Sequence, residues 1–174
     1  MTVKKAKPVL YLDSREPVEA RVKDLLGRMT LEEKFRQMGY ADCAQFAEKG
    51  KFTTKLAKDF FKDLGVGGLQ DPRMDPKPGT NLVNAIQKFL TKNTRLGIPA
   101  LIISECLHGH LSKGATIFPQ AIGLASSGNT NLIKQIAATA AREARAVGVS
   151  QGLSPDLDLA RDPRWGRVEE TYGE

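Results

Sequence analysis

The segment Pro99-Ala-Leu-Ile-Ile-Ser104 restricts the fold of this chain more than any other feature. It is a continuous apolar run, and runs of this kind are typical of strands that a parallel sheet buries on both faces. Two other short apolar runs, Leu64–Gln70 and Val149–Leu153, lie before and after it. Because helical patterns alternate with these runs, the sequence predicts an α/β fold with about three consecutive strand-then-helix units.

The first two predicted helices have clear start signals. Ser14 and Pro17 open the first, and Gly27 ends it. Thr30-Leu-Glu-Glu33 is a capping box, in which the hydroxyl and the carboxylate each accept a backbone N–H of the other residue. The side chains that we expect these helices to bury are Val18, Val22, Leu25, Leu26, Leu31, Phe35 and Met38.

Two longer helices follow. One is expected to be capped by Thr80, and the other starts at Thr130 and stops at Gly148, where glycine favours left-handed backbone. The glycines of Leu64–Gln70 indicate a strand that another part of the backbone approaches closely. The buried face of the helix after Thr80 is expected to carry Leu82, Val83, Ile86, Phe89 and Leu90.

The chain length bounds the domain organisation. A closed (β/α)8 barrel typically needs about 250 residues, whereas this chain has 174. Any (β/α)8 barrel here is therefore incomplete. We assign residues 1–13 to an N-terminal extension and residues 14–174 to the partial barrel domain.

Composition excludes several classes of protein. With 41% hydrophobic and 26% charged residues, the chain is ordinary for a soluble globular protein, and no apolar run approaches the ~20 residues of a membrane span. Its basic start lacks the continuous apolar stretch of a signal peptide, since Pro8 and Asp13 interrupt it. We therefore expect no membrane segment and read no export signal.

The net charge of +6 does not indicate nucleic-acid binding. Residues 1–100 hold 19 Lys and Arg against 12 Asp and Glu, whereas residues 101–174 hold 7 against 8. Much of the excess lies between Glu48 and Asp63 at helical spacing, which favours a solvated helix face. Cys43 and Cys106 lack the spacing of a zinc site or a disulfide framework, so we expect free thiols.

A polar loop follows the last predicted strand. Asp158–Arg167 contains three arginines, two aspartates and the only tryptophan, a composition that suits the binding of an oxygen-rich ligand. The carboxyl ends of parallel strands are where ligands bind, and Glu105 follows another of these ends. The candidate site residues are Glu105, His108, His110, Asp156, Asp158, Arg161, Asp162, Arg164 and Arg167.

Sugar recognition fits these residues best, because carboxylates accept from vicinal hydroxyls and arginine donates to others. His108 and His110 lack a third metal ligand, so we expect them to hydrogen-bond their loop to itself. No Gly-rich loop with a Walker-type lysine supports phosphate binding. Cys106 is two residues from His108 and has no evident orienting third group, which disfavours a nucleophile pair.

Several motifs in order resemble glycoside hydrolase family 3, which includes β-glucosidases, β-xylosidases and exo-β-glucanases. The resemblance implies that this chain is the incomplete N-terminal part of a TIM-like (β/α)8 barrel, which in full-length members is followed by an α/β sandwich domain. It also implies an exo-acting, retaining attack on terminal β-linked sugars that needs no cofactor. The motifs are Arg28-Met-Thr-Leu-Glu-Glu-Lys34, Leu96-Gly-Ile-Pro99, Leu107-His-Gly109, Ala115-Thr-Ile-Phe-Pro-Gln120, Glu143-Ala-Arg145, Arg161-Asp-Pro-Arg-Trp-Gly-Arg167 and Tyr172-Gly-Glu174.

The resemblance assigns sugar hydroxyls to two residues of this chain. The carboxylate before Leu-His-Gly is Glu105, and the last arginine of the Arg-Asp-Pro motif is Arg167. Many members carry aspartate at the first position, whereas glutamate recurs among β-xylosidase-like members, so glucose and xylose both stay open. The residues expected to hold the loop rather than the sugar are His108, Arg161, Asp162 and Arg164.

By the resemblance, no residue of this chain is the nucleophile or the acid/base. Members place the nucleophile and the acid/base further along than the Tyr-Gly-Glu segment, so we assign neither role here. We expect a β-glucosidase that acts on a β-linked oligosaccharide or glycoside. We expect its full-length form to contain the remainder of the barrel and a C-terminal α/β sandwich domain. The alternatives are a β-xylosidase and a stand-alone carbohydrate-binding or interaction module. A periplasmic or secreted location would be compatible with the family.

Overall fold

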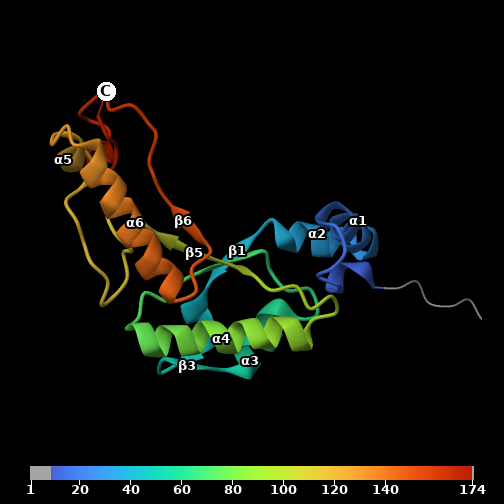
Figure 1. Ribbon diagram of the computed structural model, residues 1–174. Coiled ribbons are helices and arrows are strands. Elements are labelled where there is room, and N and C mark those ends of the chain that lie inside the picture. The colour runs from blue at the N-terminus through green and yellow to red at the C-terminus, as the bar shows by residue number, and fades with distance from the viewer. Residues whose placement is uncertain (1–8, 174) are drawn as a thin grey trace, which may run out of the picture.

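The computed structural model describes residues 9–173, and its centre is a four-stranded parallel sheet (Figure 1). Its strands follow one another in the order β1-β4-β5-β6, so neighbours in the sheet are also neighbours along the chain. This confirms the predicted α/β fold and the arrangement of an incomplete barrel. The strands are β1 Tyr40–Asp42, β4 Gly68–Gln70, β5 Leu101–Glu105 and β6 Gln151–Leu153.

The parallel sheet holds one more strand than the sequence predicted. β1 is a three-residue Tyr-Ala-Asp segment, too short and too mixed in polarity to be recognised as an apolar run. It pairs in parallel with β4, and Ala41 lies opposite Leu69. Pairing with β4, rather than the sequence pattern of β1 itself, therefore stabilises this strand.

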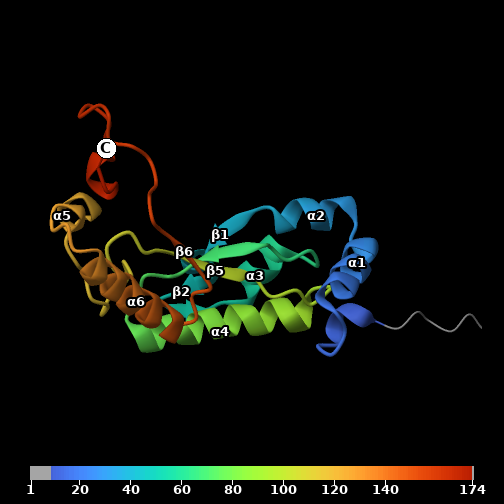
Figure 2. The ribbon, with the colours of Figure 1, turned by 45° about the horizontal axis from the view of Figure 1, so that its top comes forward.

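The chain also forms helices and a small hairpin. The helices α3 and α4 lie along one of its faces, and α1 and α2 lie at the opposite end of the molecule from α5 and α6 (Figures 1 and 2). The hairpin consists of β2 Ala47–Glu48 and β3 Lys51–Phe52. The α-helices are α1 Val18–Arg28, α2 Leu31–Gln37, α3 Thr54–Phe61, α4 Pro76–Asn93, α5 Ala121–Ala125 and α6 Thr130–Ala146. The 3-10 helices are η1 Leu10–Leu12, η2 Cys43–Phe46 and η3 Val168–Glu170.

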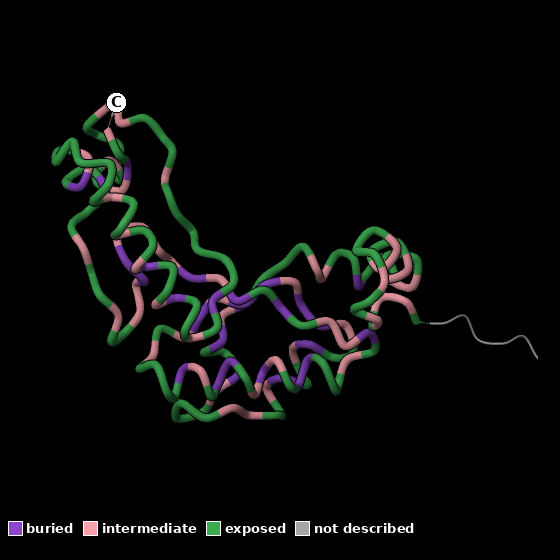
Figure 3. The backbone as a smooth tube through the Cα atoms, viewed as in Figure 1, coloured by how far each residue is buried: buried purple, intermediate pink, exposed green. Residues whose placement is uncertain are grey.

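The core lies between the sheet and the α3 and α4 helices (Figure 3). Leu69 and Ile102 project from the strands toward these helices, and Phe46 and Phe61 stack beside them with ring centroids 4.5 Å apart. The predicted buried face of α4 is confirmed, because every one of its five apolar side chains is buried: Leu82, Val83, Ile86, Phe89 and Leu90.

The other face of the sheet is open, which corrects the expectation that β5 is buried on both faces. The register places Tyr40, Gly68 and Leu101 side by side, and alternate residues of a strand share a face. Tyr40 is 71% exposed and Leu101 is 55% exposed, whereas Ile102 is 2% exposed. No helix or strand within residues 9–173 covers this open face.

The predicted buried stripes of α1 and α2 are also wrong. Leu31, Phe35 and Met38 are 84%, 71% and 86% exposed, and Val18, Val22 and Leu26 are exposed as well. The helical periodicity was read correctly, but periodicity states only which side chains share a face. Burial needs a partner surface, and within the described residues these stripes have little of it: α1 contacts η1, and only Leu25 is half-buried.

The capping box at the start of α2 is confirmed and extends into the tertiary structure. The Thr30 hydroxyl accepts the Glu33 backbone N–H at 3.2 Å, and the Glu33 carboxylate accepts the Thr30 N–H at 2.8 Å. Arg95 Nε also donates to Glu33 at 2.8 Å, across 62 residues of sequence. This bond ties the first turn of α2 to the segment before β5.

Two element starts differ from the prediction. Helix α4 begins at Pro76, so Thr80 lies inside it rather than capping it; proline suits this position because the first helical N–H has no partner. Lys49 and Gly50 form the turn of the hairpin, so the solvated helix face is only α3. By contrast, α6 begins at Thr130 as predicted, and Gly148 has a φ of +95°.

Glycine permits the close approach that was predicted before β4. A Cβ atom on Gly67 would lie 1.9 Å from the Gln37 carbonyl oxygen, which no side chain could tolerate. At the chain start, Tyr11 of η1 donates to the Leu96 carbonyl oxygen at 2.8 Å, so the segment before α1 packs on the domain. Residues 1–8 of the proposed extension lie outside the described residues.

Candidate functional site

Glu105 lies at the carboxyl end of β5, on the open face of the sheet. The register sets Glu105 opposite Leu153 of β6 and Ile103 opposite Gln151, so these residues share that face. The Glu105 side chain is half-buried, and its own carbonyl oxygen accepts the Leu111 N–H at 2.9 Å. This bond fixes the backbone of Glu105 at the strand end, and alternation along β5 places its side chain on the side of the sheet that no described element covers.

The loop after β5 is tied to itself through His108. His108 Nδ1 lies 2.8 Å from the Phe118 carbonyl oxygen, so this nitrogen carries the proton and donates. The Phe118 N–H donates back to the His108 carbonyl oxygen at 2.8 Å. Gly109 has a φ of +126°, and a Cβ there would lie 2.2 Å from the Thr116 carbonyl oxygen. His108 thus makes the loop-internal bond that the sequence predicted for it.

His110 departs from that prediction. Its side chain is buried and turns to Asp71, with Nε2 3.5 Å from Asp71 Oδ2, rather than bonding its own loop. Asp71 follows β4 and also accepts the Ser104 hydroxyl at 2.7 Å. This buried network was missed, although Asp71 directly follows an apolar run, the same signal that identified Glu105.

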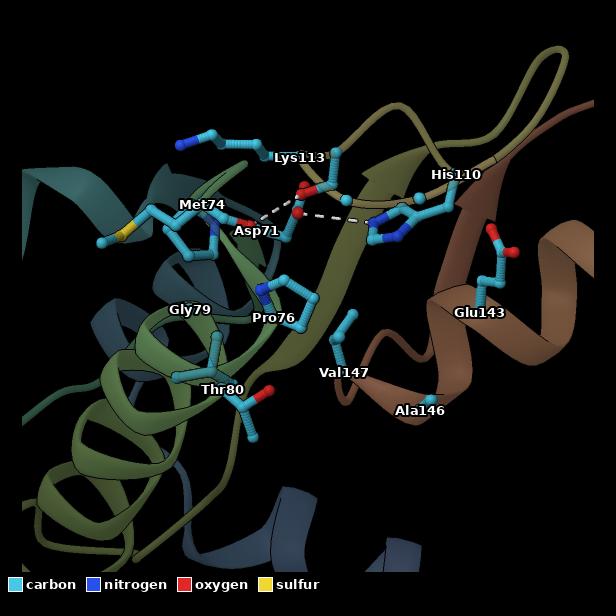
Figure 4. Close-up of a pocket in the computed structure, with 15 residues that line it drawn as sticks. Asp71, Met74, Pro76, Gly79, Thr80, His110, Lys113, Glu143, Ala146 and Val147 are labelled. Atoms are coloured by element: carbon cyan, nitrogen blue, oxygen red, sulfur yellow. Dashed lines mark hydrogen bonds and ion pairs between the residues drawn. The ribbon is translucent and has the colours of Figure 1, made fainter. Parts of the chain in front are cut away.

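A cavity of about 210 Å³ lies beside this network, between the start of α4, the end of α6 and the loop after His110 (Figure 4). Asp71, His110 and Glu143 contribute polar groups to a lining that is otherwise largely apolar. Both Glu143 oxygens are engaged, accepting the Thr116 N–H at 2.8 Å and its hydroxyl at 2.7 Å. These bonds lower the pKa of Glu143. Glu143 therefore holds the loop against α6.

Arg167 is the centre of a second cluster, on the segment that follows β6. Its Nε donates to Glu170 at 3.0 Å, and its Nη2 contacts the same carboxylate oxygen. Nη2 also lies 3.5 Å from Asp156 Oδ2. The guanidinium is 57% exposed, whereas the Asp156 and Glu170 side chains are only 7% and 20% exposed. Two shielded carboxylates thus hold one accessible cation.

Electrostatics link this cluster to Glu105 and His108. The hydrogen bond with Glu170 is the main reason that the pKa of Arg167 is raised, and Asp156 and then Glu105 contribute further. The bond to Arg167 lowers the pKa of Glu170, and an electrostatic contribution from His108 adds to this effect. The structure therefore brings the loops after β5 and β6 within electrostatic range of each other. α5 also contacts η3.

Asp156 and Asp158 form a coupled carboxylate pair. The Asp158 N–H donates to Asp156 Oδ1 at 3.2 Å. The side-chain hydrogen bond between the two residues lowers the pKa of Asp156 and raises that of Asp158. Asp156 therefore keeps its negative charge to lower pH than Asp158 does, and its Oδ2 atom lies 3.5 Å from Arg167 Nη2.

The remaining loop residues bond within their own turn. Asp162 accepts the Arg164 backbone N–H at 2.9 Å and its Nε at 3.0 Å, and the Arg164 guanidinium lowers the pKa of Asp162. The Arg161 N–H donates to the Leu159 carbonyl oxygen at 2.9 Å. The Arg161 and Arg164 side chains are exposed. This geometry gives Asp162 the place of an internal acceptor in the turn.

A nucleophilic role for Cys106 finds little support in this geometry. Burial raises the pKa of the Cys106 thiol, which disfavours the thiolate. The His108 Nδ1 that could assist is engaged with Phe118. Within residues 9–173, no group of three or more His, Cys, Asp or Glu side chains is placed to hold a metal ion. No helix in the same range is long and apolar enough to cross a membrane.

Comparison with known proteins identifies a matching family model and several similar sequences. Residues 30–174 match the family model described as the glycosyl hydrolase family 3 N terminal domain. The chain is 33% identical over 178 residues to a periplasmic β-glucosidase/β-xylosidase of Dickeya chrysanthemi, a match that covers 94% of this chain and 27% of that protein. It is 49% identical over 88 residues to a β-xylosidase of Formosa agariphila, covering 47% of this chain and 12% of that protein.

A solved structure shows the same likeness. The chain superimposes on a β-glucosidase of Erythrobacter marinus with a TM-score of 0.76 and 34% identity, covering 94% of this chain and 22% of that one. The chain therefore spans about a quarter or less of the length of these relatives.

Proposed function

The chain belongs to glycoside hydrolase family 3, and we propose that the protein that carries it is a β-glucosidase whose terminal sugar binds between Glu105 and Arg167. The named relatives are β-glucosidases and β-xylosidases, so hydrolysis of β-linked sugars is the activity that the family supports. We further propose that residues 14–174 are the first part of its barrel domain.

One observation carries the assignment of the two residues. Glu105 ends β5 on the open face of the sheet, Arg167 follows the neighbouring strand β6, and the Glu105 charge contributes to the raised pKa of Arg167. A carboxylate and a guanidinium at one mouth can accept from and donate to hydroxyls of the same sugar ring. Neither residue needs to take part in bond breaking.

Hydrolysis with retention requires two further carboxylates about 5–5.5 Å apart, one as nucleophile and one as proton donor. By the family pattern, we place both outside residues 1–174. The carboxylates of the Arg167 cluster are already committed, since Glu170 hydrogen-bonds Arg167 and Asp156 pairs with Asp158. In this proposal, the described residues bind and orient the terminal sugar.

The proposal is tested by kinetics on the protein that carries this chain, with p-nitrophenyl β-glucoside as substrate. A hydrogen bond to a charged group is typically worth ~1.5–3 kcal/mol, so Glu105→Gln and Arg167→Met should each lower kcat/KM by roughly one to two decades. Glu169→Gln is the matched control, because Glu169 is an exposed carboxylate on η3. Unchanged kcat/KM in both site variants would exclude this binding site.

A β-xylosidase is the second candidate, and two observations favour it. The 49% identical relative is a β-xylosidase, and position 105 holds glutamate, which is one methylene longer than aspartate. Xylose lacks the hydroxymethyl group of glucose, so a longer side chain would suit it. If Glu105→Asp raises activity on p-nitrophenyl β-glucoside relative to the β-xyloside, the native residue favours xylose. A protein that binds these sugars and hydrolyses neither would instead be a carbohydrate-binding module.

A further inference from the structure

The Asp156 and Glu170 side chains both form ion pairs with the Arg167 guanidinium. We propose that Asp156 and Glu170 are positioning residues, which fix the Arg167 guanidinium so that its Nη1 edge is presented to the sugar. This inference rests on the proposed function, because it takes Arg167 as a sugar ligand. Neither Asp156 nor Glu170 is proposed to touch the sugar.

Glu170 occupies one edge of the guanidinium. The Nε and Nη2 atoms of Arg167 both point to Glu170 Oε2. Guanidinium has five N–H donors in a fixed planar fork, so binding one edge sets the direction of the others. Nη1 makes no hydrogen bond to any residue in the described range 9–173. Its two N–H groups are the donors that remain for a ligand.

Asp156 fixes the same group from a second side. Its Oδ2 atom is buried and lacks a hydrogen-bond partner among the described residues. The nearest cation is Arg167 Nη2 at 3.5 Å, which is long for a hydrogen bond but close for an ion pair. A buried carboxylate without such a cation would be costly. The guanidinium therefore cannot swing away from Asp156 without leaving that charge uncompensated.

The backbone makes Asp156 a rigid reference point. Residues Asp156 and Thr171 form a β-bridge, and the Ala160 N–H donates to the Gly173 carbonyl oxygen at 3.1 Å. These contacts close the segment between β6 and Gly173 on itself. Because η3 carries Glu170 within this closed segment, both carboxylates are fixed relative to each other and to Arg167.

A double-mutant comparison distinguishes a positioning role of Asp156 and Glu170, which acts through Arg167, from a general role in stabilising the fold. We expect Asp156→Asn and Glu170→Gln each to lower kcat/KM for the better of the two p-nitrophenyl glycosides by roughly tenfold. In an Arg167→Met background, neither substitution should lower kcat/KM further, because the group that they orient is already gone. Glu169→Gln should leave kcat/KM unchanged in both backgrounds.

The possible results separate this inference from the proposed function. A large loss in Arg167→Met, with no loss in Asp156→Asn and Glu170→Gln, would overturn the positioning role and leave the sugar site standing. Losses that add to that of Arg167→Met would also overturn it, since they would reflect a structural role. No loss in Arg167→Met would overturn the sugar site itself. If Asp156→Asn fails to fold, Glu170→Gln carries the test, because its side chain is partly exposed.

Discussion

We expect Glu33→Ala to destabilise the first turn of α2 by about 2 kcal/mol at pH 7. The Glu33 carboxylate accepts the Thr30 N–H and two N–H groups of Arg95, and its side chain is only 3% exposed. Hydrogen bonds to a charged group contribute ~1.5–3 kcal/mol each. The Arg95 side chain is 48% exposed and Thr30 is exposed, so both donors regain water when the carboxylate is removed. Because water replaces the carboxylate as their partner, the expected total is about 2 kcal/mol rather than the sum over all the hydrogen bonds.

Hydrogen exchange of the α2 amides measures this local stability in the protein that carries the chain. A loss of about 2 kcal/mol corresponds to roughly 30-fold faster exchange, since 1.4 kcal/mol is tenfold. Glu32→Gln is the matched control, because Glu32 is an exposed carboxylate on the same turn. Equal exchange rates in Glu33→Ala and Glu32→Gln would refute the reasoning.

The same bonds give the stability a pH dependence with a defined sign. The side-chain bond from Arg95 lowers the pKa of Glu33 in the folded state. The stabilisation is therefore complete above the unfolded glutamate pKa of about 4.3 and is lost as pH falls through the folded value. A protein whose α2 exchange shows no Glu33-dependent difference between pH 7 and pH 3 would contradict this sign.

Three other outcomes follow from single features. Burial raises the pKa of the Cys43 thiol to about 12, so an alkylating reagent at pH 8 should leave Cys43 unmodified in the folded protein; mass spectrometry showing rapid labelling would contradict this. Gly67→Ala should cost at least ~1–3 kcal/mol, because its Cβ would overlap the Gln37 carbonyl oxygen, and an unchanged midpoint in urea would disprove the contact. Residues 1–174 alone should bind a hydrophobic dye through the exposed Leu31, Phe35, Met38 and Leu101, and should not hydrolyse either p-nitrophenyl glycoside. A sharp thermal transition without dye binding would refute the predicted exposure of apolar surface. Glycoside turnover that Glu105→Ala abolishes would refute the predicted lack of hydrolysis.

Local sequence patterns determined much of this protein. The capping box needs only Thr30 and Glu33, three residues apart, and the buried face of α4 follows from helical spacing. The apolar runs identified β4, β5 and β6, and the position of Glu105 at a strand end followed from them. These features depend on neighbours within a few residues, so the sequence states them directly.

The tertiary structure determined which residues that are distant in the sequence contact one another. Strand register brings Asp71 to Ser104 across 33 residues, and the fold brings Arg95 to Glu33 across 62. Likewise, the closed segment after β6 turns Asp156 toward Arg167. Burial was also decided at this level, since Phe35 has the spacing of a buried residue but is 71% exposed. Spacing fixes which side chains share a face, whereas only a packed neighbour removes that face from water.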